Sequence, residues 1–341
     1  MRENVPLAPL TTLGIGGAAK RFETFADVRE LSAALDDAET RGDRVMILGG
    51  GSNLVVGDAG WDGLVLQPAD RTVTRRGIVK DVAIVSAFAG AVWDDFVAEM
   101  VADGAAGVEA LSGIPGLVGA TPMQNVGAYG QEVADTIVFV RAWDRQKHEI
   151  VKFEKADCQF AYRSSMFKGS SRWIIFEVRF ALPMQTESMP VTYPELAKAL
   201  GIAVGGTAPL ALVRETVIRL RRGKGMVVDP SDPESRSAGS FFTNPIVAPE
   251  IAIDVEARAG AKPPQWPNGD HVKLAAAWLI ERAGFVKGET RGNVGISSKH
   301  ALALVNRGGA TASELIGFAN EIIDGVRNKL GVTLVPEPII L

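Results

Sequence analysis

The chain has 341 residues, of which 47% are hydrophobic and 22% charged, and its formal net charge is −4. The length allows two or three domains, and the composition excludes a disordered chain. Lys and Arg form no long basic block, so a nucleic-acid-binding surface is not expected.

Cysteine and histidine are scarce. Cys158 cannot form an internal disulfide, and His148, His271 and His300 lack the spacing of metal ligands, so no metal site is predicted. The first residues lack the apolar core of a signal peptide, and no apolar run approaches the ~20 residues of a membrane span. The sequence therefore predicts a cytoplasmic protein.

The expected elements begin with an α/β segment, continue with a strand-rich region and end with a separate helical unit. In chain order they are strand 21–24, helix 28–41, strands 45–48, 63–66 and 82–88, helix 92–103, strands 137–143 and 173–182, an insertion or hinge at 183–206 that holds a short segment at 193–200, helices 208–222, 272–283 and 312–330, and a strand-like end at 334–341. Asp27 with Glu30, and Thr311 with Glu314, have the spacing of helix capping boxes.

Three glycines follow the apolar strand 45–48 in the sequence LGGGSNLVV, residues 48–56. Glycine permits the left-handed backbone that turns successive amide groups toward one point, and such a nest binds phosphate. Residues 54–56 read as extended, so the helix of a classical dinucleotide-binding fold is not expected. Taken alone, the motif is equally compatible with a tight turn between strands.

A second glycine-rich loop covers residues 112–132, SGIPGLVGATPMQNVGAYGQE. Its small residues from Gly116 to Ala120 would let the backbone approach a flat ring system, and Gln124 and Asn125 offer amide groups. A packed structural loop is the alternative interpretation.

The two loops resemble the cofactor segments of the vanillyl-alcohol-oxidase-type FAD domain. Together with TTLGIGGAA (11–19), YRSSMFK (162–168), SAGSFFTNP (237–245) and VPEP (335–338), they resemble the UDP-N-acetylenolpyruvoylglucosamine reductase family, type I-like. The resemblance implies an α+β fold, with a vanillyl-alcohol-oxidase/PCMH-type two-part FAD-binding domain (1–70 and 71–205) and a C-terminal α/β substrate-binding domain (206–341). The C-terminal strand is expected to return to the first part.

The resemblance further implies non-covalent FAD, because neither loop contains the His or Cys to which the wider superfamily attaches flavin. The predicted FAD-binding residues are Gly49, Gly50, Gly51, Ser52, Asn53, Gly116, Gly119, Ala120, Thr121, Gln124, Asn125, Gly127 and Ala128.

Three dispersed residues match the family's catalytic positions. Arg163 matches the arginine that faces the substrate carboxylate and the flavin, and its planar, permanently charged fork suits that role. Ser240 matches the proton donor, and Glu337 matches a residue that orients the proton or steadies the intermediate. Without the resemblance, the three would read as an ion-paired arginine, a turn serine and an idle terminal carboxylate.

The resemblance assigns substrate contacts to Tyr129, Tyr193, Lys224 and Asn244. It implies reduction of UDP-N-acetylglucosamine enolpyruvate to UDP-N-acetylmuramate in peptidoglycan precursor synthesis, with NADPH as co-substrate. A monomer without nucleic-acid or membrane partners is expected. Two other functions stay open at this point: a different flavin oxidoreductase on the same FAD domain, and a non-catalytic nucleotide-binding module.

Overall fold

The computed structural model describes residues 1–341, and the chain forms two compact, discontinuous units. Unit 1 contains residues 1–4, 20–50 and 62–222, and unit 2 contains residues 5–19, 51–61 and 223–341. The chain passes from one unit to the other between Gly50 and Gly51, inside the first glycine loop. The predicted domain boundaries at residues 70 and 205 stay a prediction.

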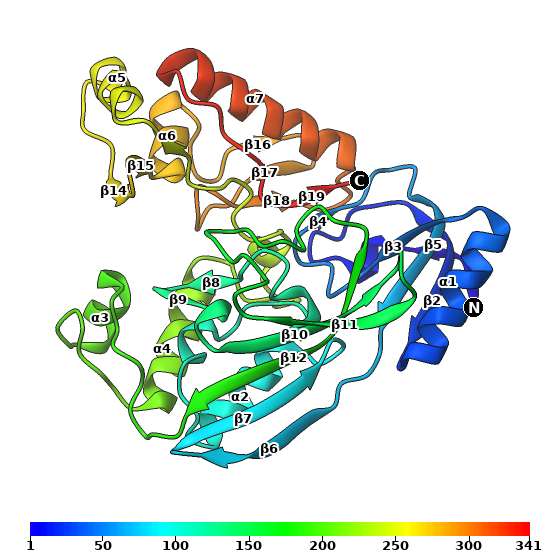
Figure 1. Ribbon diagram of the computed structural model, residues 1–341. Helices are drawn as coiled ribbons and strands as arrows, with labels where there is room; N and C mark the ends of the chain where they lie inside the picture. Colours follow the sequence, from blue (N-terminus) through cyan, green and yellow to red (C-terminus); the bar gives the residue numbers. More distant parts are fainter. The chain divides into compact units, whose positions relative to one another are not determined.

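A four-stranded sheet at the start of the chain has the order β1-β2-β5-β3. Its strands are β1 (Arg2–Pro6), β2 (Ala18–Phe25), β3 (Arg44–Ile47) and β5 (Trp61–Pro68). β3 and β5 pair in parallel, so the chain between them, residues 48–60 with the first glycine loop, must cross back to the start of the sheet. The helix α1 (Val28–Arg41) connects β2 to β3. Figure 1 shows α1 lying along this sheet.

α1 begins and ends where the sequence signals place it. The Asp27 carboxylate accepts hydrogen bonds from the amides of Arg29 and Glu30, and Gly42 ends the helix with a left-handed φ of 69°. Glu30 accepts from the amide of Ala26 instead of the N-cap amide, so the predicted capping box is formed only in its first half.

The larger sheet of unit 1 is antiparallel and has the order β11-β10-β12-β7-β6. Its strands are β6 (Val73–Val79), β7 (Val82–Phe88), β10 (Ile137–Asp144), β11 (Glu149–Glu154) and β12 (Trp173–Pro183). One face packs on α2 (Trp93–Ala102), and the apolar stripe of α2 forms part of that core.

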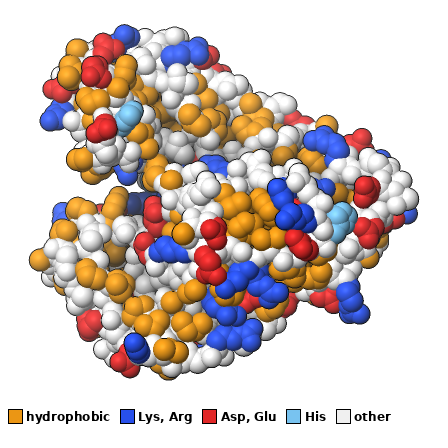
Figure 2. Space-filling view, in the orientation of Figure 1, with side chains coloured by type: hydrophobic (Ala, Val, Ile, Leu, Met, Phe, Trp, Pro, Cys, Tyr) orange, Lys and Arg blue, Asp and Glu red, His pale blue; other side chains and the backbone are white.

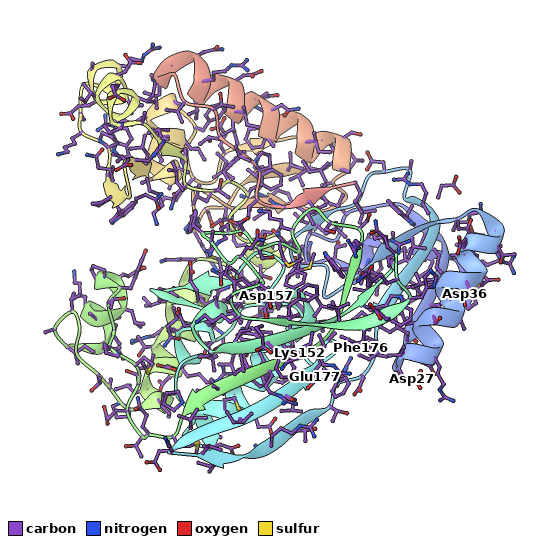
Figure 3. The ribbon with its side chains drawn as sticks, viewed as in Figure 1. Asp27, Asp36, Lys152, Asp157, Phe176 and Glu177 are labelled. Carbon is purple, nitrogen blue, oxygen red and sulfur yellow. The ribbon has the colours of Figure 1, made fainter.

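The opposite face of the larger sheet is only partly covered. Phe176 packs there in a core shared with α1, whereas neighbouring Glu177 is buried and accepts a hydrogen bond of 2.8 Å from Arg141. Figure 3 marks both residues, with Lys152 beside them on β11, and Figure 2 shows Lys and Arg side chains gathered over this part of the sheet. One part of this face therefore carries charged side chains, and the part beside it is an apolar core shared with α1.

The remaining elements of unit 1 lie within the second glycine loop or next to it. They are β8 (Gly127–Ala128), β9 (Gln131–Glu132), α3 (Pro194–Leu200), α4 (Leu210–Gly223) and the short 3-10 helices η2 (Glu109–Leu111), η3 (Val118–Ala120) and η4 (Val133–Asp135). α3 and α4 share a small apolar core, against which Tyr129 of the β8–β9 turn packs.

Unit 2 is built around α7 (Ala312–Leu330), whose Thr311 and Glu314 form the predicted capping box. Its other elements are η1 (Ala8–Leu10), β4 (Leu54–Val55), η5 (Pro233–Ser235), β13 (Ile246–Val247), α5 (Pro249–Ala259), β14 (Gln265–Asn268), β15 (His271–Leu274), α6 (Ala276–Ala283), β16 (Thr290–Arg291), β17 (Val294–Ile296), β18 (Leu304–Asn306) and β19 (Ile339–Ile340). β19 pairs in parallel with β4, directly after the first glycine loop.

Most predicted elements are confirmed within a few residues, and two are wrong in part. Residues 271–274 form β15, so the helix predicted over 272–283 begins only at Ala276. Residues 334–341 contain only the two-residue strand β19, and α5 was not predicted. No helix is both long and apolar enough to cross a membrane.

Candidate active site

The two glycine loops meet within unit 1. A Cβ added at Gly50 would lie 2.7 Å from the Cα of Gly116, and one added at Gly49 would lie 3.5 Å from the Cβ of Ala120. A side chain at Gly50 would therefore collide with the backbone of the second loop. The sequence predicted that both loops bind one cofactor, and this contact places them side by side.

The first loop also has unused hydrogen-bond donors. The amides of Gly49, Gly50 and Gly51 donate to no group of the protein, although Gly51 is buried. Two of their three carbonyl groups do have partners, because Gln67 Nε2 donates to Gly49 O at 2.9 Å and the Thr12 amide donates to Gly51 O at 3.1 Å. Three consecutive free amides on a fixed loop suit the pyrophosphate of FAD.

The second loop is packed too closely for side chains at its glycines. A Cβ at Gly119 would lie 2.5 Å from the Cβ of Ala89, and the Gly119 amide donates to Ala89 O at 3.1 Å. Thr121 is buried, and its hydroxyl donates to Val118 O at 2.9 Å. The most exposed residues of this loop, Ala120 and Gly130, have the smallest side chains, which suits the approach of a flat ring system.

Asn125 differs from the sequence-based expectation. Its Nδ2 donates to Glu132 Oε2 at 2.6 Å and to Ala161 O at 3.2 Å, while its Oδ1 accepts from the Ala134 amide at 3.1 Å. The residue is buried and has a left-handed φ of 48°. The side-chain amide thus holds the loop in shape instead of being offered to a ligand.

Arg163 lies against the second glycine loop. Its Nη2 donates to Gly127 O at 2.8 Å, and its guanidinium lies 5.3 Å from the ring centre of Tyr162. The backbone of Arg163 is left-handed with φ of 51°, an uncommon conformation for a residue other than glycine. Strain of this kind is concentrated at functional sites, because the surrounding structure must hold it in place.

Ser240 and Glu337 lie close together in unit 2, although 97 positions separate them in the sequence. The Glu337 amide donates to Phe241 O at 2.8 Å, and Phe242 forms an antiparallel bridge with Pro336. Phe241 and Phe242 are fully buried and anchor the turn, in which Gly239 has a left-handed φ of 71°. The half-buried Ser240 side chain makes no hydrogen bond within unit 2.

The first glycine loop joins this arrangement through Asn53. Its Nδ2 donates to Glu337 O at 3.3 Å, and its carbonyl accepts from the Ile339 amide at 3.0 Å. Unit 2 therefore brings three predicted site residues together: Asn53 of the cofactor loop, Ser240 and Glu337.

Two family models match the chain: "FAD binding domain" over residues 19–154, and "UDP-N-acetylenolpyruvoylglucosamine reductase, C-terminal domain" over residues 230–341. The UDP-N-acetylenolpyruvoylglucosamine reductase of Thermobifida fusca (strain YX) is 50% identical over 99% of this chain and 97% of its own length. That of Streptomyces coelicolor is 49% identical over 98% of this chain and 89% of its own length. The chain belongs to this reductase family.

The crystal structure of the family member from Thermus caldophilus superposes with a TM-score of 0.68 at 25% identity, and covers 98% of this chain and 97% of its own. The predicted α+β fold, with a PCMH-type FAD-binding domain and a C-terminal reductase domain, is thereby confirmed. The chain is an FAD-dependent oxidoreductase.

The tyrosines that this reductase was predicted to use for substrate face each other in unit 1. The rings of Tyr129 and Tyr193 lie edge to face with centres 5.4 Å apart. Burial raises the pKa of Tyr129 to about 12 and also raises that of Tyr193. Arg221 interacts electrostatically with Tyr129, and burial lowers the pKa of Arg221 to about 10, so it stays charged at neutral pH.

The two other predicted substrate residues lie in unit 2. Asn244 Oδ1 accepts a hydrogen bond of 3.0 Å from the amide of Ala276, and so caps the start of α6. Its Nδ2 keeps the capacity to donate to a ligand. Lys224 is half-buried at the beginning of the long continuous segment of this unit.

Sequence reasoning missed Gln67 and Arg221, which support the site from outside the motifs. Gln67 follows the apolar residues 64–66 of β5, beside the strand that leads into the glycine loop. A polar side chain at the end of a neighbouring parallel strand was the available signal. The sequence contained no such signal for Arg221, because a cation at the end of a helix is already explained by its favourable interaction with the helix dipole.

Proposed function

We propose that the chain reduces UDP-N-acetylglucosamine enolpyruvate to UDP-N-acetylmuramate, with NADPH as the source of hydride, in peptidoglycan precursor synthesis. Family membership over nearly the whole chain supports the substrate, because the relatives carry the corresponding reductase name. The observation that carries the chemistry is the clustering of Ser240, Glu337 and Asn53.

FAD fits the residues present, since three free amides and two closely packed glycine loops form a backbone cradle. When bound, FAD would take hydride from NADPH and pass it to the terminal carbon of the enolpyruvyl double bond. The predicted FAD residues of the two loops are proposed to hold it non-covalently. For Asn125 the proposed part is the backbone and the shape of the loop, because its amide is already used.

Ser240 is proposed to donate its hydroxyl proton to the carbon next to the carboxylate. Serine is a weak acid in water, but the carbon that it meets is strongly basic once hydride has arrived, so position matters more than a shifted pKa. The turn at Gly239 and the buried Phe241 fix that position.

Arg163 is proposed to face the substrate carboxylate, and Glu337 to steady the charge that develops beside it or to relay the proton. Tyr129, Tyr193, Lys224 and Asn244 are proposed to bind the rest of the substrate. The Arg163 guanidinium already donates a hydrogen bond of 2.8 Å to Gly127 O, which supports its being oriented before substrate binds.

The test is anaerobic stopped-flow spectroscopy on the holoenzyme. NADPH is expected to bleach the flavin, and UDP-N-acetylglucosamine enolpyruvate to restore its colour. Ser240→Ala should leave the first half-reaction nearly intact and slow the second by about 10²- to 10⁴-fold, the usual contribution of a positioned acid.

Ser171→Ala is the matched control, because Ser171 is exposed and only its carbonyl is hydrogen-bonded. Wild-type flavin that stays reduced in the presence of the enolpyruvyl substrate would rule out the proposed function, in favour of another flavin oxidoreductase. Equal losses in both half-reactions of Ser240→Ala would mean that Ser240 serves binding or folding.

A further inference from the structure

The segment 225–239 connects two proposed site residues, Lys224 and Ser240, and the resemblance did not assign it a role. In sequence it is long and rich in glycine, proline and acidic residues. Such a segment would be free to move unless side chains fixed it. In the structure its centre is η5, which two carboxylates tie to the loop between β17 and β18. Asp232 pairs with Lys299 at 2.7 Å, and Glu234 is the more deeply buried of the two.

Glu234 is buried, and its carboxylate is surrounded by donors from the loop between β17 and β18 and from Arg307, which follows β18. Oε2 accepts from Ser297 Oγ at 2.5 Å and from the Ser298 amide at 2.8 Å, and Oε1 is paired with the Arg307 guanidinium. These hydrogen bonds lower the pKa of Glu234 against the effect of burial, so it is ionised at neutral pH.

The Lys224 end of the segment rests directly on Glu234. A Cβ at Gly225 would lie 2.9 Å from Glu234 O and 3.1 Å from Glu234 Cβ, and Gly225 has a left-handed φ of 67°. No other residue type would let the chain leave Lys224 in this direction at this distance without strain. Glu234 therefore fixes the position of the Lys224 backbone through its contact with Gly225.

The Ser240 end of the segment is hydrogen-bonded to β18 and the residues just before it, and Arg307, which pairs with Glu234, follows the same strand. The Asn306 amide donates to Arg236 O at 3.0 Å, Ser237 forms an antiparallel bridge with Val305, and the Phe241 amide donates to Leu302 O at 2.7 Å. The Glu234–Arg307 ion pair therefore ties the part of the segment that Gly225 contacts to the end of the same strand that carries these backbone contacts.

We propose that Glu234 is a positioning residue that fixes the proton donor Ser240 and the substrate-binding Lys224 relative to each other. This inference rests on the proposed function, in which the lysine holds one part of the substrate while the serine protonates another. Because proton transfer depends steeply on distance, a displacement of about 1 Å at Ser240 is enough to cost a factor of ~10² in rate.

The experiment compares Glu234→Ala and Glu234→Gln in the anaerobic half-reactions of the holoenzyme. Reduction by NADPH should stay within about twofold of wild type, because Glu234 is not among the FAD-binding residues. Reoxidation by UDP-N-acetylglucosamine enolpyruvate should slow by about tenfold or more in Glu234→Ala. Glu234→Gln should be intermediate, since its amide oxygen still accepts from Ser297 or Ser298 but cannot pair with Arg307.

Two further variants keep the test decisive. Ser297→Ala removes one donor and should slow reoxidation by a few-fold even if Glu234→Ala fails to fold. Glu256→Ala on the exposed face of α5 is the control and should change neither half-reaction.

A solvent isotope effect on reoxidation that grows from wild type to Glu234→Ala would support the proposal, because it reports the proton step and not stability. The proposal is overturned if all Glu234 and Ser297 variants reoxidise at the wild-type rate, or if both half-reactions fall by the same factor. Wild-type flavin that the enolpyruvyl substrate does not reoxidise would overturn the proposed function together with this inference.

Discussion

Gly50→Ala is the sharpest perturbation of the cofactor cradle. The new Cβ would lie 2.7 Å from the Cα of Gly116, whereas ordinary contacts begin at about 3.4 Å. The atoms of Gly116 that the new Cβ would meet are all backbone, so no side chain can rotate away to relieve the clash. The two glycine loops must therefore move apart by about 0.7 Å at this point.

Overpacking of this kind costs roughly 1–3 kcal/mol. Without FAD the loops can separate and relieve the clash, whereas bound FAD would hold them together, so the cost falls mainly on binding. At about 1.4 kcal/mol for each factor of ten, the Kd for FAD is expected to rise by about 5- to 140-fold.

The assay is titration of apoprotein with FAD, followed by quenching of flavin fluorescence, together with the thermal midpoint of the apoprotein. Gly49→Ala should have a smaller effect, because its Cβ would meet Ala120 at an ordinary 3.5 Å. Gly317→Ala, in α7 with open space around it, controls for the loss of glycine alone. An unchanged Kd for FAD in Gly50→Ala would refute the close contact of the two loops.

Two predictions concern pH. Burial raises the pKa of Tyr129 to about 12, above the ~10 of an unfolded chain. The free energy of unfolding should therefore fall as pH rises from about 10 to about 12. Urea titrations at alkaline pH should show that Tyr129→Phe removes this part of the fall. Hydrogen bonding from Arg172 lowers the pKa of Asp144 to about 2, so its stabilisation is present above about pH 4 and is lost as pH falls toward 2. Arg172→Met should therefore weaken the pH dependence of stability between pH 4 and pH 2; an unchanged acid-unfolding curve would contradict this.

Much of the fold follows from local patterns in the sequence. α1 and α7 have strong caps and continuous apolar stripes, so their predicted bounds agree with the structure. The helix predicted from residue 272 was wrong in its first turn, because residues 271–274 pair with β13 and β14. Such pairing depends on partners elsewhere in the chain, which a local pattern does not contain.

The candidate site was predictable to a different extent for backbone and for side chains. Glycines at positions 50 and 119 signal close backbone approach, and the structure has that approach. A sequence does not distinguish an amide that binds a ligand from one that satisfies the backbone, so the internal hydrogen bonds of Asn125 and the capping bond of Asn244 were not foreseen. The role inferred for Glu234 also depends on contacts with residues more than 60 positions away.

The hydrogen bond between Asn53 and Glu337 joins residues 284 positions apart. Contacts of such large sequence separation form late, because a long loop must close before they are gained. Unit 1 can therefore become ordered during refolding before residues 51–61 have formed their contacts with residues 223–341 of unit 2. We expect affinity for FAD to appear in two kinetic phases, because the amides proposed to bind phosphate lie on either side of the Gly50–Gly51 peptide and would become ordered at different times.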